Sequence, residues 1–509
     1  MLSCISSFGL NGVEGFLVRV EVNIAQGLPG FEMVGLPDAA VREAKERVRA
    51  AIKNSGYAYP ASRITVNLAP ADLKKEGPAY DLPVALGILA AVEPMEAGRL
   101  ESTAAIGELS LDGSVRPVRG ALPMAISARE RGMRQLILPK GNAGEVKCVE
   151  GLRLIPVESL VQAMEHLSGR ASLEPVQTVS YQELMTERRA MVDLSDVKGQ
   201  SSAKRALEIA AAGGHNVLLI GPPGSGKTML ARCIPTILPD MSFEEALEVT
   251  RIHSVAGSVP ESGLFTERPF RSPHHTASQV SLVGGGPHAR PGEISKAHQG
   301  VLFLDELPEY RRDVLEALRQ PMEDGVVTIT RVGAQAVYPA RFMLVCSMNP
   351  CPCGHYGSRT QACRCTPNEI RRYLNRISGP LLDRIDLHIE VESIPPERLA
   401  DMRPEESSAS VRARVQAARD IQRRRYQGSG VGCNAQLTSR MMNEACAMSG
   451  QAKGLLKQAS ERMGLSNRAY TRVLKVARTI ADLAGERDIQ AEHVAEAVQY
   501  RALDRKYWG

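Results

Sequence analysis

Gly221-Pro222-Pro223-Gly224-Ser225-Gly226-Lys227-Thr228 is the stretch that decides the fold of this 509-residue chain. It follows the apolar run 217–220 and precedes the helix-compatible segment 229–238. Its glycines let successive backbone N–H groups turn inward, next to a helix N-terminus that favours anions. Lys227 would then reach the terminal phosphates of a nucleotide, and Thr228 would place its hydroxyl on Mg²⁺. The stretch therefore predicts a phosphate-binding loop; a glycine-rich turn that happens to end in Lys-Thr is the alternative.

A second apolar run, 301–304, ends in two carboxylates, Asp305 and Glu306. Such a run predicts a buried strand of a parallel sheet, with both side chains at its carboxyl end. Asp305 would hold Mg²⁺, and Glu306 would orient the water that attacks the γ-phosphate. A third predicted strand, 342–346, leads to Asn349, whose amide can bond the γ-phosphate and that water; an Asn in a turn before proline is the alternative. Together these motifs predict an ATPase that uses Mg²⁺.

The composition is that of an ordinary globular protein, with 43% apolar and 23% charged residues. A chain of this length predicts roughly two to four domains. The net charge of +5 is too small to establish nucleic-acid binding, so a merely solvated basic surface stays open. The N-terminus lacks a basic segment ahead of an apolar core, and no stretch is long enough to span a bilayer. We therefore expect a cytoplasmic protein with no membrane attachment.

Four of the ten cysteines lie close together in the sequence, as two C-x-C pairs. They are Cys351, Cys353, Cys363 and Cys365. Four thiolates can form a closed tetrahedral zinc site, although the spacing is tighter than the usual two to four intervening residues. Reduced thiols or a redox pair are the alternatives. A structural zinc is therefore a prediction, with His355 as a spare ligand, and four sulfurs would leave no open position for catalysis.

The N-terminal third has the alternating pattern of an α/β domain. Strands and a turn are predicted over 15–36, an amphipathic helix over 38–55, a strand over 64–68 and a helix over 81–91.

Residues 5–145 resemble the Lon-protease-like domain, which implies a fold of the ribosomal protein S5 domain 2 type. In Lon the nucleophilic Ser follows Gly-Pro, whereas Ala79 follows Gly77-Pro78 in this chain. No Lys lies near Leu122, where the general base would align. Without an activated nucleophile no acyl-enzyme can form. We therefore expect a non-proteolytic scaffold that helps to assemble a ring or to grip a substrate.

Residues 196–200 precede a helix predicted over 202–212 and resemble the segment that lies against the adenine ring in AAA+ ATPases. This resemblance makes Val197, Gly199 and Gln200 the candidates for the base pocket.

Two arginines of the C-terminal half match other AAA+ elements. Residues 379–386 resemble the arginine-finger segment of the magnesium chelatase and minichromosome-maintenance group, which implies that Arg384 acts on the ATP of a neighbouring subunit. Arg468 opens an amphipathic helix and matches sensor 2; a plain Arg at a helix start is the alternative. Asn349 matches sensor 1.

Two insertions also match that group. Residues 260–300 resemble the helix-2 insertion, and the alternating stretch 326–339, with Gly333 near its turn, resembles the pre-sensor-1 hairpin. In related hexamers both project into the central pore, so Arg331 is the candidate contact with the DNA backbone; a solvated hairpin charge is the alternative. The Arg-rich helix predicted over 411–426 is either a phosphate-binding face or a solvated one.

Across nearly the full length the chain resembles the ComM/YifB family of magnesium-chelatase-like AAA+ proteins. The marks are Ser-Pro-His-His-Thr at 272–276, Pro-Gly-Glu-Ile-Ser at 291–295, Asn-Pro-Cys-Pro-Cys-Gly at 349–354 and Ile-Ser-Gly-Pro-Leu-Leu-Asp-Arg-Ile-Asp at 377–386. The resemblance implies a hexameric ring whose pore takes single-stranded or branched DNA. Such a helicase drives branch migration of recombination intermediates, alongside recombination proteins, and supports the integration of DNA in natural transformation.

Two other functions stay open. A magnesium-chelatase subunit I-like ATPase would remodel a protein partner, which the fused Lon-like domain and the cysteines disfavour. A nucleotide-gated assembly platform would not need Glu306 or Arg384. The predicted fold is α/β, with a Lon-like domain at 1–168, a linker at 169–190, an AAA+ core of the helix-2-insert clade at 191–395 and a helical lid at 396–509.

Overall fold

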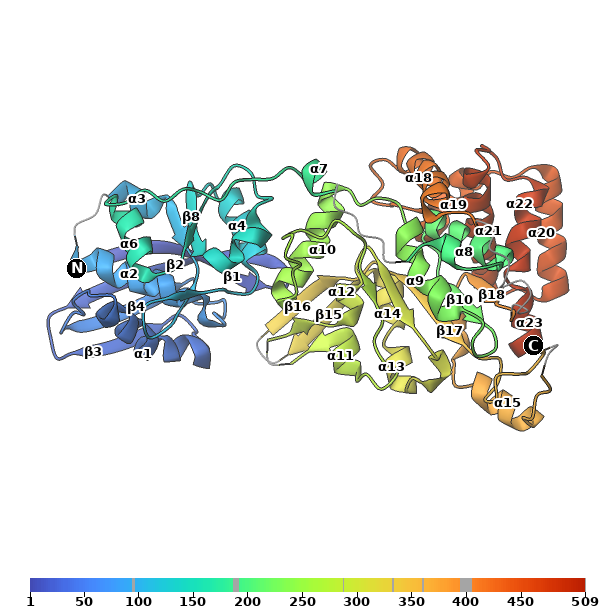
Figure 1. Cartoon of the computed structure of the whole chain (residues 1–509), viewed down its shortest axis with the longest axis horizontal. Helices are drawn as coiled ribbons and strands as arrows, with labels where there is room; N and C mark the ends of the chain where they lie inside the picture. The colour runs from blue at the N-terminus through green and yellow to red at the C-terminus, as the bar shows by residue number, and fades with distance from the viewer. Residues whose placement is uncertain are drawn as a thin grey trace.

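The computed structural model describes residues 1–93, 97–185, 192–286, 288–331, 334–358, 361–393 and 405–508. Two sheets and a group of helices follow one another along an elongated molecule, with the N-terminal sheet at one end and the C-terminal helices at the other (Figure 1). Residues 186–190 of the predicted linker, 191 and 394–395 of the predicted core, and 396–404 of the predicted lid lie outside the described residues. Within the described ranges, no helix is both long and apolar enough to cross a membrane.

The N-terminal part forms a mixed seven-stranded sheet in the order β3-β4-β2-β1-β5-β8-β9. Its strands are β1 (Leu2–Asn11), β2 (Glu14–Ala25), β3 (Gly30–Val34), β4 (Arg63–Ala69), β5 (Thr103–Ala105), β8 (Gln135–Pro139) and β9 (Arg153–Val157), and β6 (Glu108–Leu109) pairs with β7 (Val115–Arg116) outside it. The helices are α1 (Ala39–Asn54), α2 (Asp81–Val92), α3 (Ala97–Glu101), α4 (Ala121–Glu130), α5 (Ala143–Val146), α6 (Leu160–Ser168) and α7 (Tyr181–Leu184).

The predicted helices over 38–55 and 81–91 are confirmed as α1 and α2. The strands and turn predicted over 15–36 are confirmed: β2 and β3 are separated by the segment that contains Gly27 and Pro29. Strand β1 was not predicted, since its serines, among them the fully buried Ser7, interrupt the apolar pattern.

The central part holds a five-stranded parallel sheet in the order β11-β14-β17-β10-β18. Its strands are β10 (Val217–Ile220), β11 (Phe270–Arg271), β14 (Val301–Leu304), β17 (Met343–Met348) and β18 (Leu387–Glu390). Its helices are α8 (Ser201–Gly213), α9 (Lys227–Ile237), α10 (Phe243–Ala256), α13 (Arg312–Glu316), α14 (Arg319–Asp324), α15 (Pro367–Leu374) and α16 (Gly379–Leu382). Every residue of β10, β14 and β17 is buried, as expected for a parallel sheet covered on both faces. The loops after these three strands meet at the carboxyl edge of the sheet, where ligands of such sheets bind.

Two further segments lie beside this sheet. The first contains α11 (Gln279–Val283), β12 (Gly284–Gly285), β13 (Arg290–Pro291) and α12 (Glu293–Lys296). The second is the predicted hairpin, β15 (Val326–Arg331) and β16 (Ala334–Pro339), whose turn with Gly333 lies outside the described residues. The hairpin touches the N-terminal sheet, because a Cβ on Gly12 would lie only 3.0 Å from the carbonyl oxygen of Val337.

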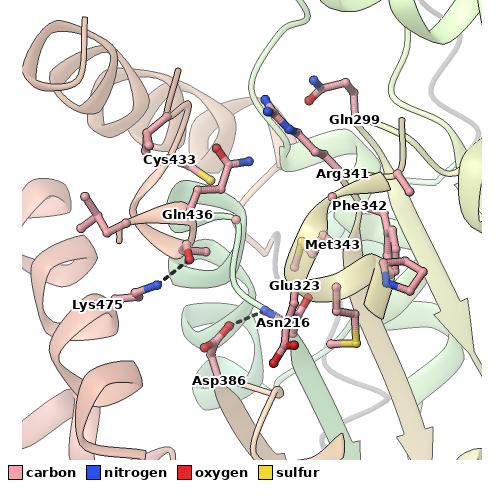
Figure 2. A pocket seen from close by; sticks show the side chains of 18 of the residues that line it. Asn216, Gln299, Glu323, Arg341, Phe342, Met343, Asp386, Cys433, Gln436 and Lys475 are labelled. Atoms are coloured by element: carbon pink, nitrogen blue, oxygen red, sulfur yellow. Dashed lines mark hydrogen bonds between the residues drawn. The ribbon is translucent and has the colours of Figure 1, made fainter. Parts of the chain in front are cut away.

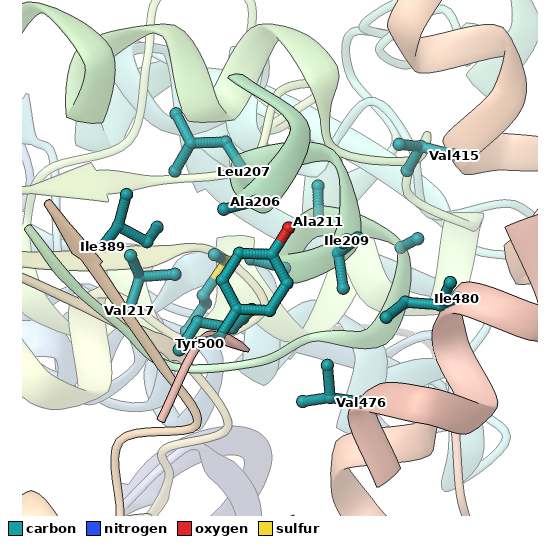
Figure 3. Close-up of a cluster of buried hydrophobic side chains, with 14 of the residues drawn as sticks. Ala206, Leu207, Ile209, Ala211, Val217, Ile389, Val415, Val476, Ile480 and Tyr500 are labelled. Carbon is teal, nitrogen blue, oxygen red and sulfur yellow. The ribbon is translucent and has the colours of Figure 1, made fainter. Parts of the chain in front are cut away.

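The C-terminal part is helical. Its helices are α18 (Ser408–Arg425), α19 (Ser439–Ala445), α20 (Gly450–Met463), α21 (Asn467–Leu483), α22 (Ala491–Gln499) and α23 (Ala502–Trp508). Apolar side chains of α8, α18, α21 and the sheet form one core, so these helices pack directly on the sheet (Figure 3).

Most of the arginines on α18 are engaged within the chain. Arg425 pairs with Asp482 at 2.5 Å, and Arg414 pairs with Glu208 at 2.5 Å. Arg419 donates to the carbonyl oxygen of Ala211 at 2.8 Å. These contacts give the Arg-rich helix a structural role and argue against a face free to bind phosphates.

Asp386 joins the C-terminal helices to the sheet. It forms an ion pair with Arg472 of α21 and accepts the backbone N–H of Asn216 at 2.9 Å. Burial raises the pKa of the Asp386 carboxyl, but the charge of Arg472 and the contact with His215 outweigh it and hold that pKa far below its usual range. The carboxylate is therefore ionised in the folded protein, where it is bound to a cation.

We expect Asp386→Asn to lower the free energy of unfolding by about 3–5 kcal/mol at pH 7, because Arg472 loses its buried partner. The folded-state pKa lies below the unfolded one, so this stabilisation is present above about pH 4 and is lost as the pH falls further. Urea unfolding of both proteins between pH 3 and 7 measures the difference. Asp420→Asn, at an exposed carboxylate on α18, is the control; equal midpoints for Asp386→Asn and wild type at pH 7 would contradict the assignment.

Candidate nucleotide-binding site

The predicted phosphate-binding loop lies between β10 and the first turn of α9. Gly224 and Gly226 have φ angles of 75° and 90°, a region that residues with a Cβ rarely adopt. Lys227 donates from Nζ to the carbonyl oxygens of Gly221 and Pro222, both at 2.8 Å. Its ammonium group therefore spans the loop, and burial lowers the pKa of Lys227.

Two further groups fit a phosphate at this loop. The buried Ser225 hydroxyl has no hydrogen-bond partner among the described residues, which is costly for a polar group and would be remedied by a phosphate oxygen. Asn349 follows β17, and its Oδ1 accepts from Lys227 Nζ at 3.2 Å. The structure thus brings the predicted amide to the predicted lysine.

A hydroxyl and a carboxylate meet beside the loop. Thr228 Oγ1 donates to Asp305 Oδ2 at 3.0 Å. The hydroxyl of Ser347 donates to the other Asp305 oxygen, which also accepts the backbone N–H of Glu306 at 3.1 Å. Hydroxyl and carboxylate oxygens are ligands that Mg²⁺ prefers, so this pair fits the ion. Ser347 was not predicted as part of the site; a polar residue near the end of an otherwise apolar strand was the available signal.

Glu306 has a left-handed backbone, with φ of 54°, and its side chain is 57% exposed at the carboxyl edge. Such a conformation is uncommon for a residue with a Cβ and is found at functional sites. The imidazole of His275 lies beside this side chain, with Nδ1 3.7 Å from Glu306 Oε2. The segment carrying His275 is held by Tyr310, whose hydroxyl donates to the carbonyl oxygen of Pro273 at 2.5 Å. The sequence marked this segment only as a family motif, because nothing in the spacing connects it with Glu306.

The base-pocket candidates lie next to the phosphate-binding loop. Gln200 Nε2 donates to the carbonyl oxygens of Glu392 at 2.6 Å and Ser225 at 3.4 Å. Val197 is buried, and the N–H of Gly199 donates to Glu405 at 3.0 Å. The segment is therefore connected to the loop through Gln200.

Arg384 lies at the opposite edge of the sheet from the phosphate-binding loop. It lines a cavity of about 560 Å³ together with Asn216, Gly300 and Met343, which stand at the amino ends of β10, β14 and β17 (Figure 2). The Arg384 side chain is 5% exposed, forms an ion pair with Glu323, and leaves its Nε without a partner among the described residues.

Arg468 is exposed in the first turn of α21. It lies one helical turn before Arg472, which pairs with Asp386 at this same amino edge. Neither Arg384 nor the start of α21 therefore belongs to the carboxyl edge of its own chain.

The four predicted cysteine ligands are brought together. The Sγ atoms of Cys351, Cys353 and Cys363 lie 3.4 to 3.7 Å apart, and those of all four cysteines, including Cys365, lie within 4.8 Å of one another. Tetrahedral Zn–S bonds imply sulfur separations of about 3.8 Å, whereas a disulfide requires about 2.05 Å. Backbone N–H groups of Arg364 and His355 lower the pKa of the Cys353 thiol to about 6, whereas burial raises the pKa of the Cys351 and Cys365 thiols.

Comparison with known families gives the class of protein that this fold and site define. Residues 193–399 match the family described as magnesium chelatase, subunit ChlI. Residues 20–142 match subunit ChlI of Mg-chelatase, and residues 405–501 match the ChlI C-terminal family. The chain is a magnesium-chelatase-like AAA+ protein, and its class implies an ATPase that uses nucleotide and Mg²⁺.

Two relatives match nearly from end to end. YifB of Escherichia coli K12 is 48% identical over 508 residues, 99% of this chain and 98% of the relative. Competence protein ComM of Haemophilus influenzae is 46% identical over 507 residues, with the same coverage. The chain belongs to the ComM/YifB family. The magnesium-chelatase 67 kDa subunit of Chlorobaculum parvum, in contrast, is 31% identical over 166 residues, 31% of this chain and 24% of that protein.

Proposed function

We propose that this protein is a hexameric, ATP-dependent DNA motor of the cytoplasm, which drives branch migration of recombination intermediates and supports the integration of DNA in natural transformation. The observation that carries the ATPase part is the contact of Lys227 with Asn349 beside the contact of Thr228 with Asp305. The DNA part is supported by the near full-length similarity to a relative named as a competence protein.

In this proposal the loop 221–228 binds the phosphates of ATP, and Val197, Gly199 and Gln200 form the base pocket. Thr228 and Asp305 hold Mg²⁺, which would neutralise charge on the phosphates when bound. Glu306 accepts a hydrogen bond from the attacking water and orients it, while Asn349 donates its amide N–H groups to the γ-phosphate or accepts from that water.

Arg384 serves the ATP of a neighbouring subunit, and Arg468 acts as sensor 2. Arg384 cannot reach the phosphate-binding loop of its own chain across the sheet, but the amino edge of one subunit can face the carboxyl edge of the next in a ring. The chemistry is then a property of the interface between subunits.

We assign the N-terminal sheet to a non-proteolytic Lon-like domain over 1–168, followed by a linker over 169–190. Ala79 is buried, so this position offers neither a nucleophile nor access to one. The AAA+ core of the helix-2-insert clade then spans 191–395 and the helical lid 396–509. The four cysteines of the core hold a structural Zn²⁺.

The hairpin β15–β16 is the DNA-contacting element, with Arg331 at the end of β15. We expect branched or single-stranded DNA to raise the ATP turnover of the wild type, and Arg331→Ala to reduce that stimulation at least about fivefold while DNA-independent turnover persists. Steady-state phosphate release with and without DNA measures both. Arg63→Ala, which removes an equal charge from a distant strand, is the control. A wild type that neither binds DNA nor responds to it would overturn the motor proposal.

The second candidate is a chelatase-type ATPase that remodels a protein partner, favoured by the similarity to the Chlorobaculum subunit. It predicts turnover that is indifferent to DNA, so the same assay separates the two functions.

A further inference from the structure

The loop that carries the four cysteines touches the phosphate-binding loop. Gly354 lies between the two C-x-C pairs, and a Cβ built on it would lie 2.8 Å from Pro223 Cγ and closer still to Cδ. Gly221 and Pro222 share a cavity of about 100 Å³ with Gly354 and Tyr356. The two loops are therefore in direct contact, and any side chain at position 354 would clash with Pro223.

The cysteine loop also begins at a site residue. Cys351 follows Asn349 by two residues, and Asn349 accepts from Lys227 at 3.2 Å. Cys351 is fully buried, and its Sγ accepts the N–H of Tyr356 at 3.3 Å. A metal bound to Cys351 therefore restrains the backbone two residues after Asn349. A metal bound to Cys353 restrains the backbone next to Gly354.

The described part of the cysteine loop packs on the core through its cysteines but has no regular secondary structure. Residues 351–358 and 361–366 contain neither helix nor strand, so regular backbone hydrogen bonding does not stabilise the described part of the loop. Its sulfurs, however, converge at separations of 3.4 to 3.7 Å, which match those around one tetrahedral ion. Where ligands are not held by secondary structure, the metal supplies the folding energy of the site.

We propose that Zn²⁺ bound by Cys351, Cys353, Cys363 and Cys365 holds the cysteine loop as a wall of the nucleotide site, with Gly354 against Pro223, so that metal occupancy sets the affinity for ATP. The inference rests on the proposed function only in that the loop 221–228 binds nucleotide. It requires neither DNA nor a ring.

Metal content and nucleotide affinity test the first half of the proposal. The purified wild type is expected to carry about one zinc ion per chain, as measured by inductively coupled plasma mass spectrometry. Cys363→Ser combined with Cys365→Ser is expected to lose the zinc and to raise the Kd for a fluorescent ATP analogue about tenfold or more, since the wall and Asn349 are both released. Cys4→Ser, at an exposed cysteine of β1, should change neither.

A wild type without zinc overturns the proposal, as does a zinc-free variant with the Kd of the wild type. Failure of the nucleotide-site assignment is a separate result, because the zinc-loaded wild type would then not bind the analogue at all. Circular dichroism and the unfolding midpoint of the variant distinguish a local change from loss of the fold.

The contact itself is tested by a matched pair of glycines. Gly354 and Gly357 have similar φ angles of 81° and 76°, but a Cβ on Gly357 would meet only Lys506, at an ordinary 3.7 Å. Gly354→Ala is expected to weaken ATP binding about tenfold or more with zinc retained, whereas Gly357→Ala leaves it near the wild-type value. Equal losses of ATP affinity in the two variants would mean that backbone strain alone causes the loss. That result would overturn the proposed role of the contact between Gly354 and Pro223.

Discussion

Glu306→Gln is expected to lower ATP turnover by about 10²–10⁴-fold while ATP binding stays close to that of the wild type. The amide keeps the size of the side chain but accepts a hydrogen bond from the attacking water far less strongly than a carboxylate. Because the Glu306 side chain is largely exposed, the substitution leaves no buried partner unpaired, and the unfolding midpoint should change little.

Steady-state phosphate release gives the turnover, and a fluorescent ATP analogue gives the affinity. The control is Glu309→Gln, which changes a carboxylate three residues further on. Glu309 pairs with Arg376 and has no proposed role in hydrolysis, so this variant should retain its turnover. Lys227→Ala is expected to lose the affinity as well, because it removes the cation that spans the loop. Turnover of Glu306→Gln within about threefold of the wild type would exclude Glu306 as the residue that orients water.

The elements at the carboxyl edge could be predicted because each combines a local pattern with a local structure. Gly224 and Gly226 adopt positive φ angles, which glycine readily allows, so their place in the loop can be predicted from residue type. The apolar run 301–304 predicts a buried strand, which the structure confirms, and Asp305 and Glu306 follow at its carboxyl end. The position of Asn349 at the carboxyl edge could be predicted in the same way, because it follows the apolar strand β17.

Other features depend on contacts between distant segments, which no local pattern encodes. His275 approaches Glu306 only because the segment after β11 folds over the neighbouring strand β14. Gly354 reads as an ordinary turn glycine until Pro223 is seen beside it. The arginines of α18 looked available for phosphates because their partners, such as Asp482, lie far along the chain.

The position of Arg384 at the amino edge leads to the second large effect. Arg384→Ala is expected to lower turnover by about 10³–10⁵-fold with ATP binding retained, since an arginine that stabilises transition-state charge contributes on that scale. Its partner Glu323 is about half exposed, so losing Arg384 does not strand a buried carboxylate. The fold should therefore survive the substitution.

Mixing subunits separates a role across the interface from one within the chain. Arg384→Ala and Glu306→Gln are each expected to be inactive alone, but an equimolar mixture should recover turnover at about a quarter of its sites, where Glu306 of one subunit meets Arg384 of the next. A mixture as inactive as its components would contradict the assignment, provided that each variant alone still binds ATP. Glu323→Gln is the control for the ion pair, because it removes the partner of Arg384 and keeps the arginine. This variant should keep its turnover if the Arg384 guanidinium acts on the ATP of the neighbouring subunit. It should lose its turnover if activity requires the ion pair itself.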